Sequence, residues 1–354
     1  MGRPKLRLPK VSARLRGKRI MGRTAAVLLK AILLSSVLQL SGCGTDSNKE
    51  NNSAFKPRLS DYRIFQGKLA DLVPIDEAKI IEIASPLFTD YADKQRIVLL
   101  PKGEKMKGNG SDLPDFPDGT VIAKTFFYPR SSSGNTVSQF IVETRLLIKS
   151  SHQWSAATYK WNDAQDEAFL LQDSAIVPIA FVDDKGKSRA INYKIPSRDD
   201  CLACHRQRDQ LVPLGMKLRN MNIDVHRDET LINQLEYLKR HQKLDMASLE
   251  AITRTPDYSA GSTTLEAKAR AYLDSNCAHC HRPKGTARFT GLHLTYEETA
   301  DPAVTHRKRE EIARRITATG PQHMPQIGTT ISHTEGVQLI IDYLNDADQK
   351  IKTR

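Results

Sequence analysis

The sequence predicts an α+β chain of several domains, in which a β-rich, sandwich-like region precedes a mostly α-helical one. Short runs of β-branched and aromatic residues bounded by turn residues fill 121–195, whereas apolar residues recur at helical spacing from residue 197 onward. With 354 residues, 39% of them hydrophobic, the chain can bury more than one core. We expect a leader at 1–42, a tether at 43–58, a β-rich domain at 59–196, a connecting segment at 197–261 and a C-terminal domain at 262–350.

The leader carries most of the charge imbalance of the chain. The formal net charge is +12, but residues 1–42 contain ten Lys and Arg and no acid, so the remainder is nearly neutral. That balance argues against nucleic acid as a partner, because a nucleic-acid binder carries its cations on the folded surface. Residues 25–40 form an apolar run that is typical of a secretory signal and shorter than the roughly 20 residues of a membrane-spanning helix.

The signal ends in Leu40-Ser41-Gly42-Cys43, which resembles the lipobox of bacterial lipoproteins. We therefore expect Cys43 to be acylated and to become the first residue of the mature chain, whether translation starts at Met1 or Met21. The lipid would anchor an exported body to a membrane without spanning it. By resemblance to the sorting rules of Gram-negative lipoproteins, Gly44 favours the outer membrane, with the body facing the periplasm.

Strand and helix signals follow one another along the rest of the chain. Strands are expected at 121–128, 139–149 and around Trp154 and Trp161. A hairpin turn is predicted at 183–186, between strands at 175–182 and 188–195. Helices are expected in 231–238, after a capping box of Thr263 and Glu266, and after an N-cap at Thr334, with a linker at 253–262.

The cysteines after Cys43 form two pairs, and each pair reads C-x-x-C-H. The first motif spans 201–205 (CLACH) and the second spans 277–281 (CAHCH). Two disulfides are one alternative for an exported protein. A zinc site of four cysteines is another, although the 72 residues between the pairs exceed the usual spacing of about 15–20.

C-x-x-C-H is the attachment motif of c-type haem, and its spacing has a chemical reason. Two thiols separated by two residues reach the two vinyl groups of one porphyrin, and the following imidazole reaches the iron on the same face. We therefore expect two covalently attached haem c groups. The attachment points would be Cys201, Cys204, Cys277 and Cys280, and the proximal iron ligands would be His205 and His281.

The distal iron ligands are predicted from the methionines and histidines that follow each motif. Met324 lies in a Gly/Pro-rich loop at 320–328, before the last helix, and is the expected ligand of the second iron, with His323 as its rival. Met216 is the expected ligand of the first iron. The alternatives for the first iron are Met221, His226, His241 and Met246.

From about residue 59 the chain resembles a family of bacterial dihaem c-type cytochromes that have a β-rich N-terminal half and are often lipoproteins. The stretches that carry the resemblance are 59–74, 86–103, 116–129, 159–168, 195–205, 270–283 and 324–344. The resemblance implies a class I cytochrome c-like domain at 262–350 that holds the second haem, and a first haem at 197–261. The chain departs from the family at Met216, where relatives carry Pro, and lacks a Pro-Gly-Asp-Pro segment before Met324.

These features predict a carrier of single electrons between the two irons and a periplasmic redox protein. Fully ligated iron binds no substrate, so no catalytic residue is expected. The first alternative is a peroxidase-like dihaem enzyme in which one iron has an exchangeable sixth ligand. The second is an electron-accepting subunit of a periplasmic dehydrogenase, with the β-rich half as the interface.

Overall fold

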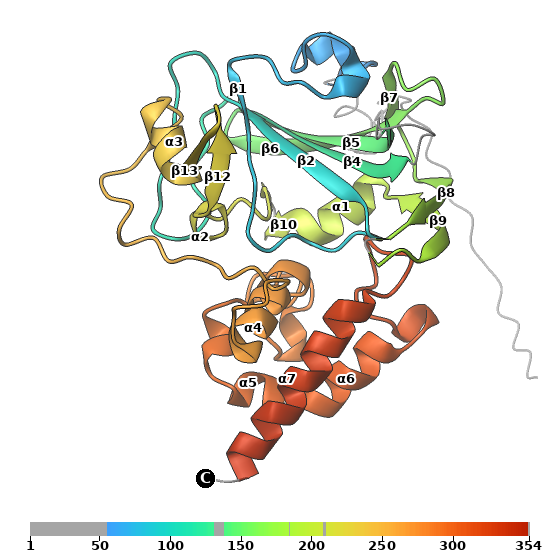
Figure 1. The fold of residues 1–354 in the computed structure, drawn as a ribbon, viewed down its shortest axis with the longest axis vertical. Helices are drawn as coiled ribbons and strands as arrows, with labels where there is room; N and C mark the ends of the chain where they lie inside the picture. Colours follow the sequence, from blue (N-terminus) through green and yellow to red (C-terminus); the bar gives the residue numbers. More distant parts are fainter. Residues whose placement is uncertain (1–54, 131–137, 184, 208–209, 353–354) are drawn as a thin grey trace, which may run out of the picture. The chain divides into compact units, whose positions relative to one another are not determined.

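The computed structural model describes residues 55–130, 138–183, 185–207 and 210–352, and these belong to one compact unit that starts at Lys49 (Figure 1). The predicted signal and Cys43 lie outside the described residues. Within those ranges, no helix combines the length and the apolar character that a membrane span needs.

A six-stranded antiparallel sheet forms the larger part of the structure. Its strand order is β1-β2-β4-β5-β6-β7, so neighbours in the sheet are mostly neighbours in sequence. The strands are β1 (Ala78–Ile80), β2 (Asp93–Leu99), β4 (Val121–Arg130), β5 (Ser138–Ser150), β6 (Gln153–Trp161) and β7 (Ala168–Leu171). Only short connections are needed, because antiparallel neighbours can be joined by hairpins.

The two faces of the sheet pack against different parts of the chain. Alternation along β4 places Ala123 on one face, with Leu59 and Leu72 from the N-terminal segment. Ile122 lies on the opposite face, where it packs with Met216 and Leu218. The second face therefore covers the segment that follows the first C-x-x-C-H motif.

A separate hairpin of β8 (Ala175–Val182) and β9 (Ser188–Ile195) covers one end of the sheet. Its turn closes through a hydrogen bond from the Gly186 N–H to the Asp183 carbonyl, and Gly186 has a φ of +75° that glycine adopts readily. Phe181 and Tyr193 pack on Phe126 of β4. The predicted hairpin is confirmed.

The segment after the hairpin contains short helices and two-stranded ladders. It runs through α1 (Arg198–His205), β10 (Arg206–Gln207), β11 (Gln210–Leu211), α2 (Leu218–Met221), β12 (Asp224–Arg227), β13 (Thr230–Asn233), α3 (Gln234–Arg240) and β14 (Leu244–Asp245). β14 pairs in parallel with β3 (Met106–Lys107). This last ladder joins the segment to the connection between β2 and β4.

Four helices follow: α4 (Leu265–Asn276), α5 (Ala303–His306), α6 (Arg309–Thr317) and α7 (Thr334–Lys352). The N-cap of α4 is Thr264, whose hydroxyl accepts the Ala267 N–H, so the N-cap predicted at Thr263 is wrong by one residue and its capping box with Glu266 is not formed. α4 and α7 share an apolar core, and α7 begins at Thr334 itself. A side chain at Gly336 of α7 would overlap the ring of Tyr272 of α4, so this contact requires glycine.

The fold class predicted from the sequence is wrong. The described residues are mostly β and contain one six-stranded antiparallel sheet rather than a sandwich. Residues 262–350 do not show the class I cytochrome c domain that was expected there. The sequence error has a physical cause: alternation marks strands but does not say which strands pair, and an amphipathic helix does not specify which surface it packs on.

Candidate cofactor site

The first C-x-x-C-H motif lies on helix α1. Ser197 caps the helix in a reciprocal pair: its hydroxyl accepts the Asp200 N–H, and the Asp200 carboxylate accepts the Ser197 N–H. Asp200 therefore completes the capping box that starts α1. Since residues three and four apart share a helix face, Cys201, Cys204 and His205 are neighbours on one side of α1.

The His205 imidazole is oriented by the backbone. Its Nδ1 lies 2.8 Å from the Val212 carbonyl oxygen, which can only accept a hydrogen bond. Nδ1 therefore carries the hydrogen, and Nε2 keeps its lone pair. Burial lowers the pKa of His205 to about 4, which favours the neutral ring. A neutral imidazole whose second nitrogen donates to a carbonyl is the arrangement that metal-binding histidines use.

The second motif forms one helical turn at the end of α4. The N–H groups of Cys280 and His281 both donate to the Cys277 carbonyl, at 3.2 and 3.0 Å. Gly285 lets the following loop return close to the motif, because a side chain there would overlap the Cys280 carbonyl. A turn of backbone thus carries each motif, within α1 for the first and directly after α4 for the second.

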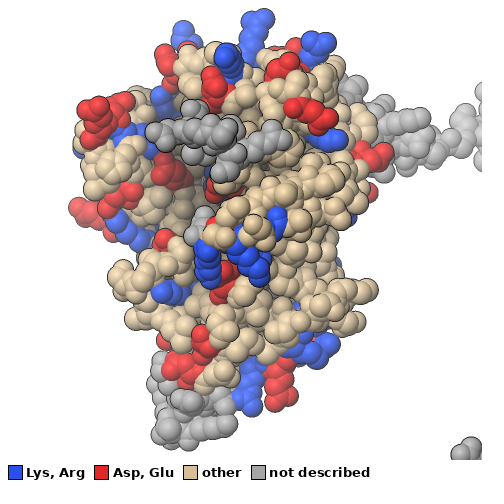
Figure 2. Space-filling view, turned by 45° about the vertical axis from the view of Figure 1, so that its right-hand side comes forward, with Lys and Arg blue, Asp and Glu red and all other residues tan. Residues whose placement is uncertain are grey.

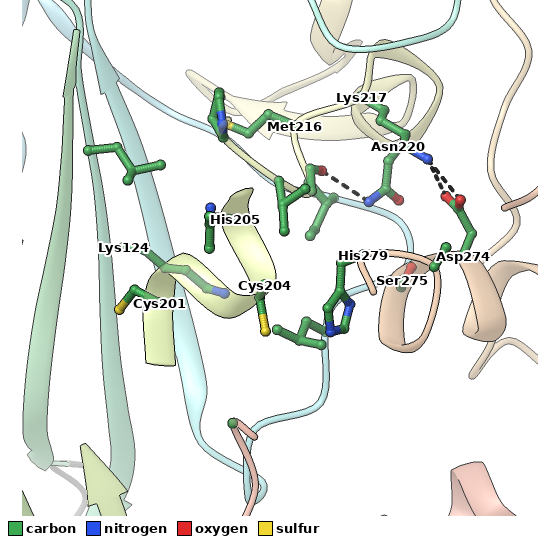
Figure 3. A pocket seen from close by; sticks show the side chains of 18 of the residues that line it. Lys124, Cys201, Cys204, His205, Met216, Lys217, Asn220, Asp274, Ser275 and His279 are labelled. Carbon is green, nitrogen blue, oxygen red and sulfur yellow. Dashed lines mark hydrogen bonds and ion pairs between the residues drawn. The ribbon is translucent and has the colours of Figure 1, made fainter. Parts of the chain in front are cut away.

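Each motif lines a cavity. The first cavity has a volume of about 660 Å³ and contains Cys201, Cys204, His205 and Met216 in its lining (Figure 3). The second has a volume of about 790 Å³ and is lined by Cys277, Cys280, His281 and Met324, with His323 beside them. Both volumes lie within the roughly 300–1,000 Å³ of small-molecule and cofactor sites.

The two cavities share a wall that includes Cys204 and His279. Cys204 Sγ, Cys280 Sγ and a ring nitrogen of His279 all lie within 4.8 Å of one another. The interaction between the two sulfur atoms raises the pKa of Cys204 and lowers the pKa of Cys280. The two C-x-x-C-H motifs therefore lie close together.

This contact bears on the two alternatives to haem. The described cysteines Cys201, Cys204, Cys277 and Cys280 are all free thiols. Within the part of the chain that the structure describes, the Cys204–His279–Cys280 cluster takes one cysteine from each pair and leaves Cys201 and Cys277 outside. A structural zinc site needs four ligands, and this cluster supplies three.

The residues around the first cavity fit a haem group. The motif supplies two thiols and an oriented imidazole, and the cavity has the size of a cofactor site. Its lining also contains buried guanidinium nitrogens without a hydrogen-bond partner among the described residues: Arg96 Nη2, Arg219 Nε, and Arg282 Nε and Nη2. Buried donors of this kind require an acceptor, and the two propionates of haem would supply carboxylate oxygens.

The distal-ligand predictions divide into those inside and those outside the cavities. Met216, which is 3% exposed, lines the first cavity with His205, and Met324 lines the second with His281. His323 also lines the second cavity, and its Nδ1 lies 3.0 Å from the Ala318 carbonyl. The other candidates for the first iron, Met221, His226, His241 and Met246, line neither cavity.

Sequence reasoning missed several residues that line the cavities. Arg96 and Lys124 come from sheet strands more than 75 residues before the first motif. His279 occupies a variable position of the second motif, and His333 precedes α7. The only local signal was the position of His279 between two cysteines, since the other residues reach the cavities through strand pairing and helix packing.

Comparisons with protein-family models, with curated proteins and with solved structures found no match for this chain. The resemblance to dihaem cytochromes therefore stays a prediction that depends on the residues of the chain itself.

Proposed function

We propose that this chain is an electron-transfer protein that carries two covalently attached haem c groups. The observation that carries the proposal is that each C-x-x-C-H motif forms a helical turn at a cavity of cofactor size. In each attachment a thiol adds across a vinyl group, so that an S–C bond forms while the sulfur's hydrogen moves to the neighbouring carbon. Haem iron then supplies a one-electron couple.

The chain itself holds and orients these groups. Cys201 and Cys204 would hold the first haem, and His205 would ligate its iron through Nε2 because Nδ1 is engaged by Val212. In the second cavity Cys277, Cys280 and His281 would take the same roles. We assign Met216 and Met324 as distal ligands, since each lines the cavity of its motif.

The contact between the two motifs supports electron exchange within one chain. Cys204 and Cys280 belong to different motifs and their sulfur atoms lie within 4.8 Å. The external partner would be a redox protein. Figure 2 displays acidic and basic side chains mixed over one face, with a group of Lys and Arg near its centre, and no broad field of one sign. That mixture supports a protein partner rather than nucleic acid.

The proposal includes export and a lipid anchor. Both would depend on the signal and on Cys43, which lie outside the described residues. The mature chain should fractionate with membranes, and mass spectrometry of its N-terminal peptide should find acyl groups on Cys43 that a Cys43→Ser variant lacks. A mature N-terminal peptide without acyl groups would contradict the anchor without affecting the haem assignment.

Haem content tests the central claim. The chain is expressed with its signal in a host that attaches c-type haem, and a pyridine haemochrome spectrum, a haem-stained gel and the intact mass are recorded. We expect two haem groups per chain. The double variants C201S/C204S and C277S/C280S should each retain one. A colourless protein, or one that contains zinc in place of haem by elemental analysis, would overturn the proposal.

Carbon monoxide separates the carrier from a dihaem enzyme. Iron with two strong protein ligands binds carbon monoxide slowly or not at all, whereas iron with an exchangeable sixth position binds it rapidly. We expect no rapid change in the spectrum of the ferrous protein. Rapid binding to one haem would favour a peroxidase-like enzyme and would remove either Met216 or Met324 as a ligand.

A further inference from the structure

The segment from Met324 to Ile331, called the Met324 segment below, borders both cavities. Pro325, Ile327 and Thr329 line both of them, and Met324 lines the second. The segment belongs to no helix or strand, so its course is not fixed by a regular pattern of hydrogen bonds. Where the Met324 side chain lies therefore depends on the contacts that hold the two ends of the segment.

The first end of the Met324 segment is attached to α6. The Met324 N–H donates to the Arg315 carbonyl at 3.0 Å, and Arg315 Nε donates to the Gln322 carbonyl at 2.7 Å. Beyond this point the N–H groups of residues 326–329 donate to no backbone carbonyl in the part of the chain that the structure describes. The contact with α6 alone therefore leaves most of the segment unsupported.

Asp90 supplies the attachment at the other end. Its Oδ1 accepts the N–H groups of Thr330 and Ile331, at 2.8 and 3.1 Å, and its Oδ2 accepts the Thr330 hydroxyl at 2.8 Å. Asp90 is 2% exposed, and hydrogen bonds to an ionised acceptor are stronger than those between neutral groups. One carboxylate thus holds two successive residues that lie about 240 positions further along the chain.

The sheet fixes Asp90 in turn. The hydroxyl of Tyr128, a buried residue of β4, donates to the Asp90 carbonyl at 2.8 Å. Asp90 has a φ of +48°, in the left-handed region that Asp and Asn adopt more readily than most side chains. The Ile331 side chain packs against the same apolar cluster as Tyr128, but such packing is not directional. The carboxylate is therefore the contact that sets the orientation of this end.

We propose that Asp90 is a positioning residue for the second haem: its carboxylate holds the Met324 segment so that Met324 stays on the iron. This assignment rests on the proposed function. Asp90 lines neither cavity and acts through the backbone of Thr330 and Ile331. The sheet would thereby stabilise the ligation of a haem that is attached directly after α4.

Imidazole binding to the ferric, full-length dihaem protein tests the assignment. Imidazole reaches the second iron only while Met324 is detached, so its apparent dissociation constant falls as the detached fraction rises. Asp90→Asn keeps the size of the side chain and suits the left-handed backbone, but replaces one acceptor oxygen by a donating NH₂ group. The variant should bind imidazole about 10- to 100-fold more tightly, as expected for the loss of hydrogen bonds to a buried carboxylate.

Two further measurements report on the iron ligand itself. D90N should lose part of the weak red absorption band that sulfur coordination gives to ferric haem. The reduction potential of its second haem should fall, because a methionine ligand raises the potential. The C201S/C204S variant, which keeps only the second haem, identifies the signals that belong to it.

Glu167→Gln is the matched control. The Glu167 carboxylate likewise accepts the N–H and the hydroxyl of one residue, Ser60, at 3.3 and 2.5 Å, and Glu167 lines neither cavity. Imidazole affinity in E167Q should equal that of the unmodified protein. Thr330→Val removes only the hydroxyl donor, so imidazole should bind about 2- to 10-fold more tightly. Should Asp90→Asn fail to fold, Thr330→Val carries the test.

The outcomes are distinct. Unchanged imidazole affinity in both D90N and T330V would overturn the positioning role and leave the haem assignment intact. An equal change in E167Q would do the same, because the effect would then follow from general loss of stability. A protein without haem would instead overturn the proposed function. An unmodified protein whose second haem lacks the sulfur band would overturn Met324 as a ligand, and the positioning role with it.

Discussion

The two candidate haem sites have the same five-residue motif and very different surroundings. The first motif faces a sheet that carries a row of three cations, Arg96, Lys124 and Arg145, and four acidic residues line the same cavity. The second motif lies among helices α4, α6 and α7, where the cavity is lined mainly by apolar and aromatic groups. A charged residue at that cavity, Arg315, has Glu311 at 3.7 Å as its partner.

The two sites therefore share a motif and differ in the charge that surrounds it. Charge and burial around the iron are among the means by which a protein sets a haem potential. The following predictions separate the two sites through their different supporting contacts.

The largest expected effect concerns the packing behind the second motif. Gly336 of α7 touches the ring of Tyr272, and both residues line the second cavity. Gly336→Ala places a methyl group within that ring, and such overpacking costs about 2–3 kcal/mol of unfolding free energy. Urea denaturation followed by circular dichroism measures the loss.

Gly261→Ala is the matched control for this substitution. No atom lies within contact of a methyl group at Gly261, so its unfolding free energy should stay close to that of the unmodified protein. We also expect the G336A variant to alter the spectrum of the second haem and not of the first. Equal destabilisation by both substitutions would mean that the α4–α7 contact is looser than the structure indicates.

Local features of the sequence were predicted better than the architecture. Both motifs, the hairpin at 183–186 and the helix that begins at Thr334 could be predicted locally, because each depends on residues close together in the chain. The row of Arg96, Lys124 and Arg145 could not be read, since a shift of one residue in strand register would turn one of these side chains to the other face.

The fold class failed for a related reason. Strand patterns at 121–195 are compatible with one sheet or with two sheets packed together, and the choice depends on which strands pair. The structure puts β4, β5 and β6 in one sheet and leaves β8 and β9 as a separate hairpin. The helical part was also assigned by resemblance to a complete domain, although its amphipathic stripes specify only that each helix has an apolar face.

The second prediction concerns pH and depends on His333 at the second cavity. Its ring stacks on Phe88 at 4.1 Å, and burial lowers its pKa to about 4. In the unfolded chain the His333 imidazole takes up a proton near pH 6.5, whereas in the folded chain it stays neutral down to about pH 4. Stability is therefore complete above pH 6.5 and falls as the pH drops toward 4. Between pH 7.5 and 5 the loss should be about 1–2 kcal/mol.

The control for this effect removes the titrating ring while keeping the stack. His333→Phe should reduce the pH dependence of urea denaturation between pH 7.5 and 5 by the share that His333 contributes. The charged groups that bear on His333 are Glu335, which opposes the shift, and Lys94 and Lys185, which add to it. His152→Asn, at a histidine whose side chain is 93% exposed, should leave the slope unchanged. If the unfolding free energy of H333F changed with pH as much as that of the unmodified protein, His333 would be excluded as a source of the pH dependence.

The smallest effect distinguishes the helices that carry the motifs. Ser197 caps α1 and Thr264 caps α4, so replacing either by Ala should cost about 1 kcal/mol, whereas Thr263→Ala should cost much less. Cys201 lies within the first turn after its cap, while Cys277 lies a full helix beyond Thr264. S197A should therefore also lower the fraction of chains that carry the first haem, measured by intact mass, and T264A should leave both haems attached. If T264A lowered haem attachment as much as S197A, the loss would follow from general destabilisation. A loss confined to S197A would mean instead that the first motif depends on its helix being formed before the thiols react.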